Sequence, residues 1–241
     1  VLVDCFPVGG AAVLWPIPGG RMAFNILHPV DFLFTLPLVV ALLSIVFLRE
    51  EKPKKTRGKK PASPSKRRKW CYWGLGLSAA YALLGVGMKS LASAGFEADL
   101  ARRGTKFQRR MESPTHFNLL LWRSVVDRGD EFWVGYRSVF EFHSTPVRWT
   151  IYLKGAEALA GVAEMRETKT LARFTDGWWI ARPHATGVWI GDIRFGEARS
   201  WGEKKSMVDS RMAFAWDVFP DKDHGDKARQ IYPQNLNGID T

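Results

Sequence analysis

Cysteine is scarce in this sequence, with only Cys5 and Cys71 among 241 residues. Two thiols exclude a disulfide-stapled scaffold and a cysteine-rich zinc module. The sequence also lacks the Gly-x-Ser-x-Gly motif, so Ser-His-Asp catalysis has no support, and it lacks a phosphate-binding glycine loop. Aromatic residues, in contrast, make up 13% of the chain and include 11 tryptophans, which excludes wholesale disorder.

Acidic residues are rare in the first part of the chain. Residues 1–91 hold 4 Asp and Glu against 13 Lys and Arg, whereas residues 92–241 hold 20 against 22. Most of the net charge of +11 is therefore confined to the first part. This uneven distribution argues against a generally basic nucleic-acid-binding domain, and we expect no nucleic acid among the partners.

Charge is absent from two long apolar stretches. Phe32 to Leu48 is a run of 17 residues and Trp70 to Met88 a run of 19, and charged residues flank both. About 20 apolar residues are enough for a helix to cross the hydrocarbon core of a bilayer. We therefore predict two transmembrane helices, over about residues 29–48 and 70–88, in contact with membrane lipids. The alternative is two buried core helices of a soluble domain.

The segment between these stretches, residues 49–69, is strongly basic. It contains 11 Lys and Arg, opposed only by Glu50 and Glu51, and its prolines indicate a flexible loop. A run of this kind can bind nucleic acid or anionic lipid, but short cytoplasmic loops of membrane proteins show the same excess. We favour the second explanation, which places this loop inside and both residues 1–28 and the residues after Lys89 outside.

The remainder of the chain has the pattern of a β-rich domain, residues 92–220, entered by a helix over Ala92 to Met111. An Ala-rich segment from Gly155 to Met165 predicts a second helix, and residues 221–241 read as a polar tail. The fold class that we predict is thus an α+β membrane protein with an extracytoplasmic β-rich domain. The predicted strands cover residues 119–126, 132–142, 149–153, 178–181, 188–195 and 211–218.

Side-chain alternation in the second of these strands predicts two faces. Phe132, Val134, Tyr136, Phe140 and Phe142 share one face, and Arg137 and Glu141 fall on the other. The strand tryptophans are expected in the core rather than in a ligand platform.

Asp31 and His28 are the candidate chemical residues at the start of the first apolar stretch. Asp31 is the only charged residue between Arg21 and Arg49. It is either a functional ionisable group at the membrane boundary or the N-cap of the helix. His28 can share a metal ion or a proton with it. The histidines at positions 116, 143, 184 and 224 are isolated in the sequence and are predicted to be non-catalytic.

Several short motifs occur in a distinctive order. Asp4, Gly10 and Leu14-Trp15-Pro16 come first, followed by Arg21, Phe24, Asp31 and Thr35. The second apolar stretch is followed by the motif Pro114-Thr115-x-Phe117-Asn118-x-Leu120-Leu121-Trp122-Arg123. The last residues of the pattern are Phe174, Gly177, Asp192, Arg194 and Gly196. In this order and spacing the chain resembles the bacterial membrane-bound metal-dependent hydrolases over roughly residues 4–216. It departs from their pattern at Pro7 and Gly9, where Thr and Tyr are usual.

The resemblance implies a multi-pass protein of the bacterial inner membrane with a zinc- or manganese-class ion. Asp4 matches a presumed metal position, so the resemblance implies Asp4 as a metal-binding and catalytic residue. From their own positions we add Asp31 as a catalytic candidate and His28 as a metal-binding candidate. The family's other presumed ligands lie upstream of Asp4, and the chain begins with Val, so we expect a hydrolase without its N-terminal half that binds metal weakly. The competing hypothesis is a non-enzymatic membrane-anchored module whose outer domain binds a lipid, peptide or envelope partner.

Overall fold

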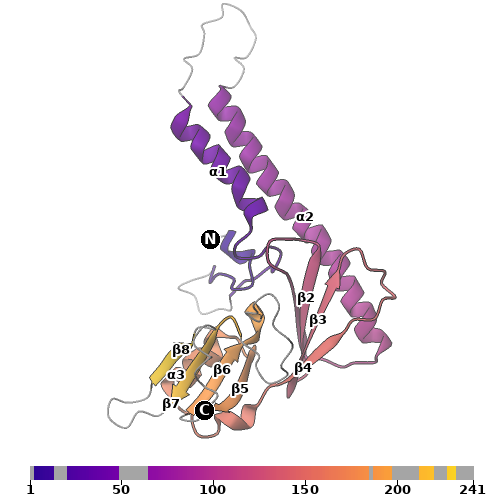
Figure 1. The fold of residues 1–241 in the computed structure, drawn as a ribbon, viewed down its shortest axis with the longest axis vertical. Helices are drawn as coiled ribbons and strands as arrows, with labels where there is room; N and C mark the ends of the chain where they lie inside the picture. Colours follow the sequence, from indigo (N-terminus) through magenta and orange to yellow (C-terminus); the bar gives the residue numbers. More distant parts are fainter. Residues whose placement is uncertain are drawn as a thin grey trace, which may run out of the picture. The chain divides into compact units, whose positions relative to one another are not determined.

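The computed structural model describes residues 3–13, 21–48, 65–184, 187–196, 212–219 and 227–231. It contains helices and two four-stranded antiparallel sheets, which confirms an α+β fold (Figure 1). The chain divides into two compact units. The first consists of Val1–Arg103, Glu112–Arg123 and Tyr136–Val147, and the second of Gly104–Met111, Ser124–Gly135 and Arg148–Thr241.

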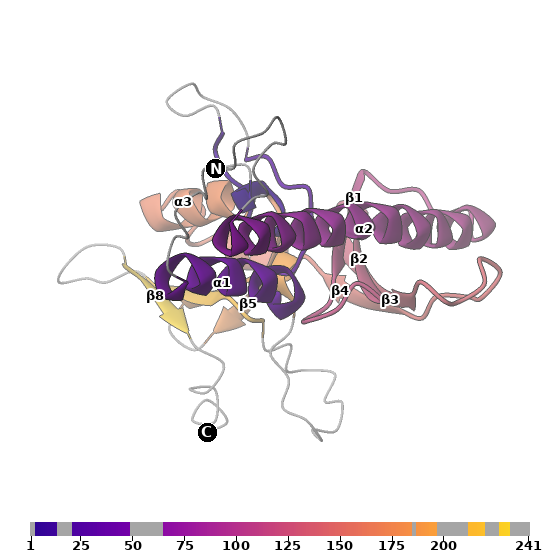
Figure 2. The same cartoon turned by 90° about the horizontal axis from the view of Figure 1, so that it is seen from above.

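Two helices dominate the first unit. After a single 3-10 turn, η1 (Val3–Cys5), the chain forms α1 (Phe32–Phe47) and then α2 (Lys66–Arg102). The two helices run side by side as a hairpin in both views (Figures 1 and 2). Asp31 caps the start of α1, and the hydroxyl of Ser65 accepts the N–H of Arg68 at the start of α2.

Small residues allow the two helices to approach closely. A Cβ atom on Gly74 would lie 2.5 Å from the Cβ of Ala41 and 2.6 Å from the carbonyl oxygen of Pro37. One turn further along α2, the hydroxyl of Ser78 donates a 2.8 Å hydrogen bond to the carbonyl of Phe34. Gly74 and Ser78, four positions apart on α2, therefore form a close helix contact, as expected for small residues at this spacing.

The predicted boundary between a second span and a separate connecting helix is wrong. The helix α2 runs unbroken from Lys66 to Arg102, so it includes residues 66–69 of the predicted basic loop and ends before Met111. The helix ends two residues before Gly104, which has a positive φ of 61°. A glycine in this left-handed conformation commonly terminates an α-helix. Residues 49–64 of the predicted loop lie outside the described residues.

The helices differ in their suitability as membrane spans. Of the helices that the structure describes, α2 is long and apolar enough to cross a membrane, judged by length and composition alone. The 16 residues of α1 fall short of the usual span because the helix starts only after its Asp31 cap. Two full-length spans, as predicted from the sequence, are therefore not confirmed.

The first sheet has the order β1-β2-β3-β4. Its strands are β1 (Arg109–Pro114), β2 (Leu121–Asp127), β3 (Glu131–Ser138) and β4 (Trp149–Leu153). Strands β2, β3 and β4 match predicted strands with small shifts at their ends, whereas β1 occupies residues that were partly assigned to the connecting helix. In the β3–β4 pair, Phe132 lies opposite Tyr152 and Val134 opposite Thr150.

The second sheet has the order β5-β6-β7-β8. Its strands are β5 (Trp179–His184), β6 (Gly187–Asp192), β7 (Ala215–Phe219) and β8 (Lys227–Ile231), and the single turn η3 (Ile193–Phe195) follows β6. Strand β8 corrects the prediction of a structureless polar tail. It pairs antiparallel with β7 at the edge of the sheet, with Asp217 opposite Arg229. An edge strand is held by backbone hydrogen bonds, so its sequence carries little hydrophobic signal.

The Ala-rich helix predicted over residues 155–165 is also wrong. That segment contains the short turn η2 (Ala156–Leu159), and the α-helix of this region is α3 (Arg166–Phe174). Val162 and Met165 instead pack with Leu171, Ile190 and Val218 in a buried cluster. Tertiary packing therefore overrides the helix propensity of this segment.

The two faces predicted for the strand over residues 132–142 are confirmed only as far as β3 extends. Phe132 and Val134 are buried as expected, but β3 ends at Ser138, and Phe140 and Phe142 in the following loop are 76% and 81% exposed. Arg137 is almost fully buried against Gly95 of α2 and donates to the carbonyls of Glu141, Phe142 and Thr145. Those bonds fix the loop and compensate for burying the guanidinium.

We expect Gly74→Leu to destabilise the hairpin and Gly76→Leu to leave it nearly unchanged. The leucine at position 74 collides with Pro37 and Ala41, whereas nothing lies within 4 Å of a Cβ at position 76. Overpacking of this kind costs about 1–3 kcal/mol. Thermal unfolding in detergent micelles, followed by circular dichroism, measures the difference. Equal destabilisation by the two variants would contradict the close contact at Gly74.

Candidate functional site

Asp31 lies at the N-terminus of α1 with both carboxylate oxygens engaged. Its Oδ1 accepts the backbone N–H groups of Leu33 at 3.0 Å and Phe34 at 3.2 Å, and its Oδ2 accepts the hydroxyl of Tyr81 on α2 at 3.0 Å. The residue is only 4% exposed. This geometry supports the capping interpretation of Asp31, and the bond to Tyr81 also ties the start of α1 to α2.

His28 contacts His116, a histidine that is isolated in the sequence and was predicted to be non-catalytic. The ring of His28 lies against that of His116 with a centroid distance of 4.1 Å. His116 belongs to the turn between β1 and β2, and the next residue, Phe117, stacks on Phe32 at 5.1 Å. The two histidines are 88 positions apart, so only the motif around Pro114 could have drawn attention to His116.

The surroundings of His28 favour its neutral form. Burial lowers the pKa of His28, and the neighbouring His116 lowers it further, although the Val30 carbonyl and Asp31 act in the opposite direction. In the neutral form Nδ1 accepts the N–H of Val30 at 3.2 Å. A neutral imidazole can serve as a metal ligand or as a proton acceptor.

The predicted metal-binding residues do not form a metal centre in the described structure. Asp4 lies exposed in η1, and Asp31 is occupied by its cap and by Tyr81. Within the described ranges, no group of three or more His, Cys, Asp or Glu side chains could hold a metal ion. A structural or catalytic zinc ion needs about three protein ligands or more, so these residues alone do not fit a zinc- or manganese-class ion.

The later motif residues have structural contacts. Arg194 donates to Asp192 through Nη2 at 2.7 Å, and it also donates to the carbonyl of Phe174. Asp192 is fully buried and accepts the backbone N–H of Arg194 at the start of η3. The pair of Asp192 and Arg194 is thus a buried, fully bonded ion pair, the geometry typical of a structural role.

Two of the remaining histidines have contacts within their own units. His184 on β5 is 3.3 Å from Asp217 on β7, measured from Nδ1 to Oδ1, a proximity that the linear sequence did not reveal. The carbonyl of His143 accepts a hydrogen bond from Arg102. His224 lies outside the described residues.

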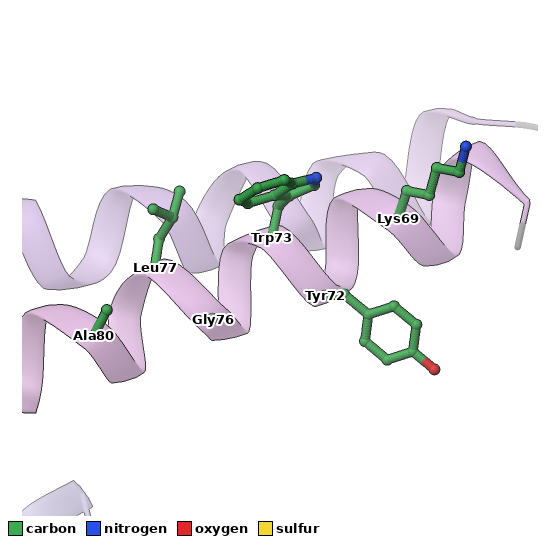
Figure 3. Close-up of a pocket in the computed structure, with 6 residues that line it drawn as sticks. All are labelled: Lys69, Tyr72, Trp73, Gly76, Leu77 and Ala80. Atoms are coloured by element: carbon green, nitrogen blue, oxygen red, sulfur yellow. The ribbon is translucent and has the colours of Figure 1, made fainter.

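A shallow groove runs along the first half of α2 (Figure 3). It exists because Gly76 has no side chain to fill it, and Trp73 and Leu77 lie on one side with Tyr72 on the other (Figure 3). The lining is apolar apart from the Lys69 ammonium and the Tyr72 hydroxyl. The six lining residues are Lys69, Tyr72, Trp73, Gly76, Leu77 and Ala80.

No known protein family, curated protein or solved structure matches the chain. The resemblance to metal-dependent hydrolases therefore stays a prediction, and the site must be judged by its own geometry. That geometry consists of a capped helix start, a histidine in ring contact with a second histidine, and an apolar helix surface.

We expect Asp31→Ala to lower the free energy of unfolding and Asp31→Asn to have a much smaller effect. Alanine removes the cap of α1 and the acceptor for Tyr81, a loss of about 1–3 kcal/mol, whereas asparagine still caps well. Denaturant unfolding in micelles measures both variants. A large and equal loss in the two variants would show that the negative charge, rather than the hydrogen bonds, is what matters.

Proposed function

We propose that the chain is a membrane-anchored protein of the bacterial inner membrane, with the α1–α2 hairpin in the bilayer and the β-rich part outside. The observation that carries the proposal is the distribution of side chains on the hairpin. Small and polar residues are buried between the helices, whereas large apolar residues point outward. This arrangement is the reverse of that in a soluble helical pair.

The residues between the helices are small. Ala41, Ser44, Gly74, Ser78 and Ala82 are buried there. In a bilayer, where hydrophobic burial gives no driving force, close packing of such residues and hydrogen bonds such as Ser78 to Phe34 hold helices together.

The outer surface of the hairpin is apolar over its whole length. Only 17% of the apolar window of α2 is buried within the structure. A core helix of a soluble domain would be mostly buried, and an apolar surface of this extent is unfavourable in water. The exposed large residues are Phe32, Leu33, Leu36, Val39, Val40, Leu42, Leu43, Ile45, Val46, Phe47, Trp70, Tyr72, Trp73, Leu75, Leu77, Leu83, Leu84 and Val86.

The ends of the hairpin also suit a membrane. Lys66 to Lys69 begin α2, and Trp70, Tyr72 and Trp73 follow at the level where aromatic rings of membrane proteins concentrate. The groove beside Gly76 then faces acyl chains, with Lys69 at its headgroup end. Helix α1 is about 24 Å long, somewhat short of the hydrocarbon core, a mismatch that bilayers accommodate by local thinning.

The orientation follows from the basic segment. With residues 49–69 in the cytoplasm, the excess of Lys and Arg obeys the positive-inside rule. Residues 1–28 and the β-rich part then lie outside, where they are available to lipid, peptide or envelope partners.

The resemblance supports a second proposal, metal-dependent hydrolysis at the membrane surface. The close contact between the imidazoles of His28 and His116 is the observation in its favour, but further ligands are needed from beyond the described residues. We expect calorimetric titration of the chain with zinc to show weak binding that Asp4→Ala does not alter. Tight stoichiometric binding that Asp4→Ala abolishes would instead place the metal site within this chain.

A charge on the outer surface of α2 tests the membrane proposal. Leu83 is 73% exposed, so in a soluble protein Leu83→Asp would be harmless or would improve solubility. In a bilayer it costs about 2.5–3.5 kcal/mol. We therefore expect Leu83→Asp to reduce the fraction of protein that remains in membranes after alkaline carbonate extraction.

Phe140→Asp is the matched control, because Phe140 is equally exposed but lies in the loop after β3. We expect that variant to remain in the membrane fraction like the unmodified chain. Recovery of the unmodified chain in the carbonate supernatant would refute the membrane proposal.

A further inference from the structure

We propose that the turn between β1 and β2, residues 115–120, dips into the headgroup region of the same bilayer and contacts lipid through Phe117 and Leu120. This inference rests on the proposed function, because it requires the α1–α2 hairpin to lie in the membrane. It goes further in giving the β-rich part a lipid contact of its own, made by the turn that also contains His116.

Asn118 gives the turn a fixed shape. Its side-chain oxygen accepts the backbone N–H groups of Leu120 at 2.9 Å and Leu121 at 2.8 Å, and its amide donates to the Thr115 hydroxyl and the His116 carbonyl, both at 3.0 Å. The indole of Trp122 donates to the carbonyl of Leu119. The exposed side chains of the turn are therefore presented from a preorganised backbone.

Contacts with α2 give the depth of the turn. A Cβ on Gly85 would lie 3.6 Å from Leu119 and 3.0 Å from the carbonyl of Ile26, so both segments pass beside this glycine. Gly85 belongs to the charge-free stretch of α2 and precedes Lys89 by four residues, about 6 Å along the helix. The turn thus lies level with the last apolar turn of α2.

The outer surface of the turn is apolar at this level. Phe117 is 50% exposed and Leu120 is 47% exposed. Phe117 adopts a φ of 61°, which is unfavourable for a bulky residue, and its ring stacks on the exposed Phe32 of α1. The turn surface and the apolar surface of the hairpin are therefore continuous.

Lipid is the occupant that this arrangement favours. The helix residues on either side of Gly85, Leu84 and Val86, are exposed and apolar, so the turn is flanked by the same surface that the hairpin presents to the bilayer. The histidine rings beside Phe117 are amphipathic, which suits the boundary between headgroups and acyl chains.

Nitroxide spin labels test the depth of the turn. Labels are placed by Leu120→Cys, Leu83→Cys and His143→Cys in a Cys5→Ala, Cys71→Ala background, in vesicles of phosphatidylethanolamine and phosphatidylglycerol. Collision rates with oxygen, which partitions into lipid, are compared with those of a water-soluble nickel chelate. His143 is the aqueous control, because it is exposed and its carbonyl is bonded to Arg102, about 20 Å beyond Lys89 along α2.

We expect the labels at positions 120 and 83 to collide more with oxygen and the label at position 143 to collide more with the nickel chelate. If the label at position 120 collides mainly with the nickel chelate while the label at position 83 collides mainly with oxygen, the lipid contact of the turn is overturned and the proposed function is not. Nickel access at both would overturn the proposed function as well, and exclusion of both reagents from 120 would overturn lipid contact in favour of a protein partner. Leu121→Cys, which is also exposed, repeats the measurement if Leu120→Cys misfolds.

Discussion

The carboxylate of Asp31 connects the two helices on which the first unit is organised. It satisfies two N–H groups at the start of α1 and accepts the hydroxyl of Tyr81 from α2, so one side chain fixes both where α1 begins and where it lies against its neighbour. The same bonds occupy the oxygens that a metal ion would require. A structural demand therefore accounts for a residue whose position alone had suggested chemistry.

Composition and alternation were enough to predict the class of fold. The charge-free stretches gave α1 and the first half of α2, and the alternation from Phe132 to Val134 gave the start of β3. The continuity of α2 beyond Lys89 could not be predicted in the same way. The charge-free stretch ends at Lys89, whereas the helix continues through the charged residues Glu97 and Asp99. Strand β8 was missed because an edge strand needs no hydrophobic residues.

The candidate site was harder to predict, because its contacts join distant segments. Asp31 had two equally good interpretations, and only the atoms around it support the cap. The pairing of His28 with His116 depends on how the β1–β2 turn lies beside α2, which no spacing along the chain encodes. In the same way, Asn118 in its motif resembles a polar site residue, yet its bonds all serve the turn that contains it.

In the proposed membrane arrangement, the unbroken length of α2 would couple the bilayer mechanically to the loop around Arg137. The helix is about 55 Å long, so in the membrane arrangement roughly its last third projects into water. Gly95 in that projecting part packs on the buried Arg137, whose guanidinium holds three loop carbonyls. A thinner bilayer that tilts the submerged part must also swing the projecting part, because no proline hinge absorbs the rotation. In that arrangement, a change in bilayer thickness would also change the position of the loop that contains Phe140 and Phe142.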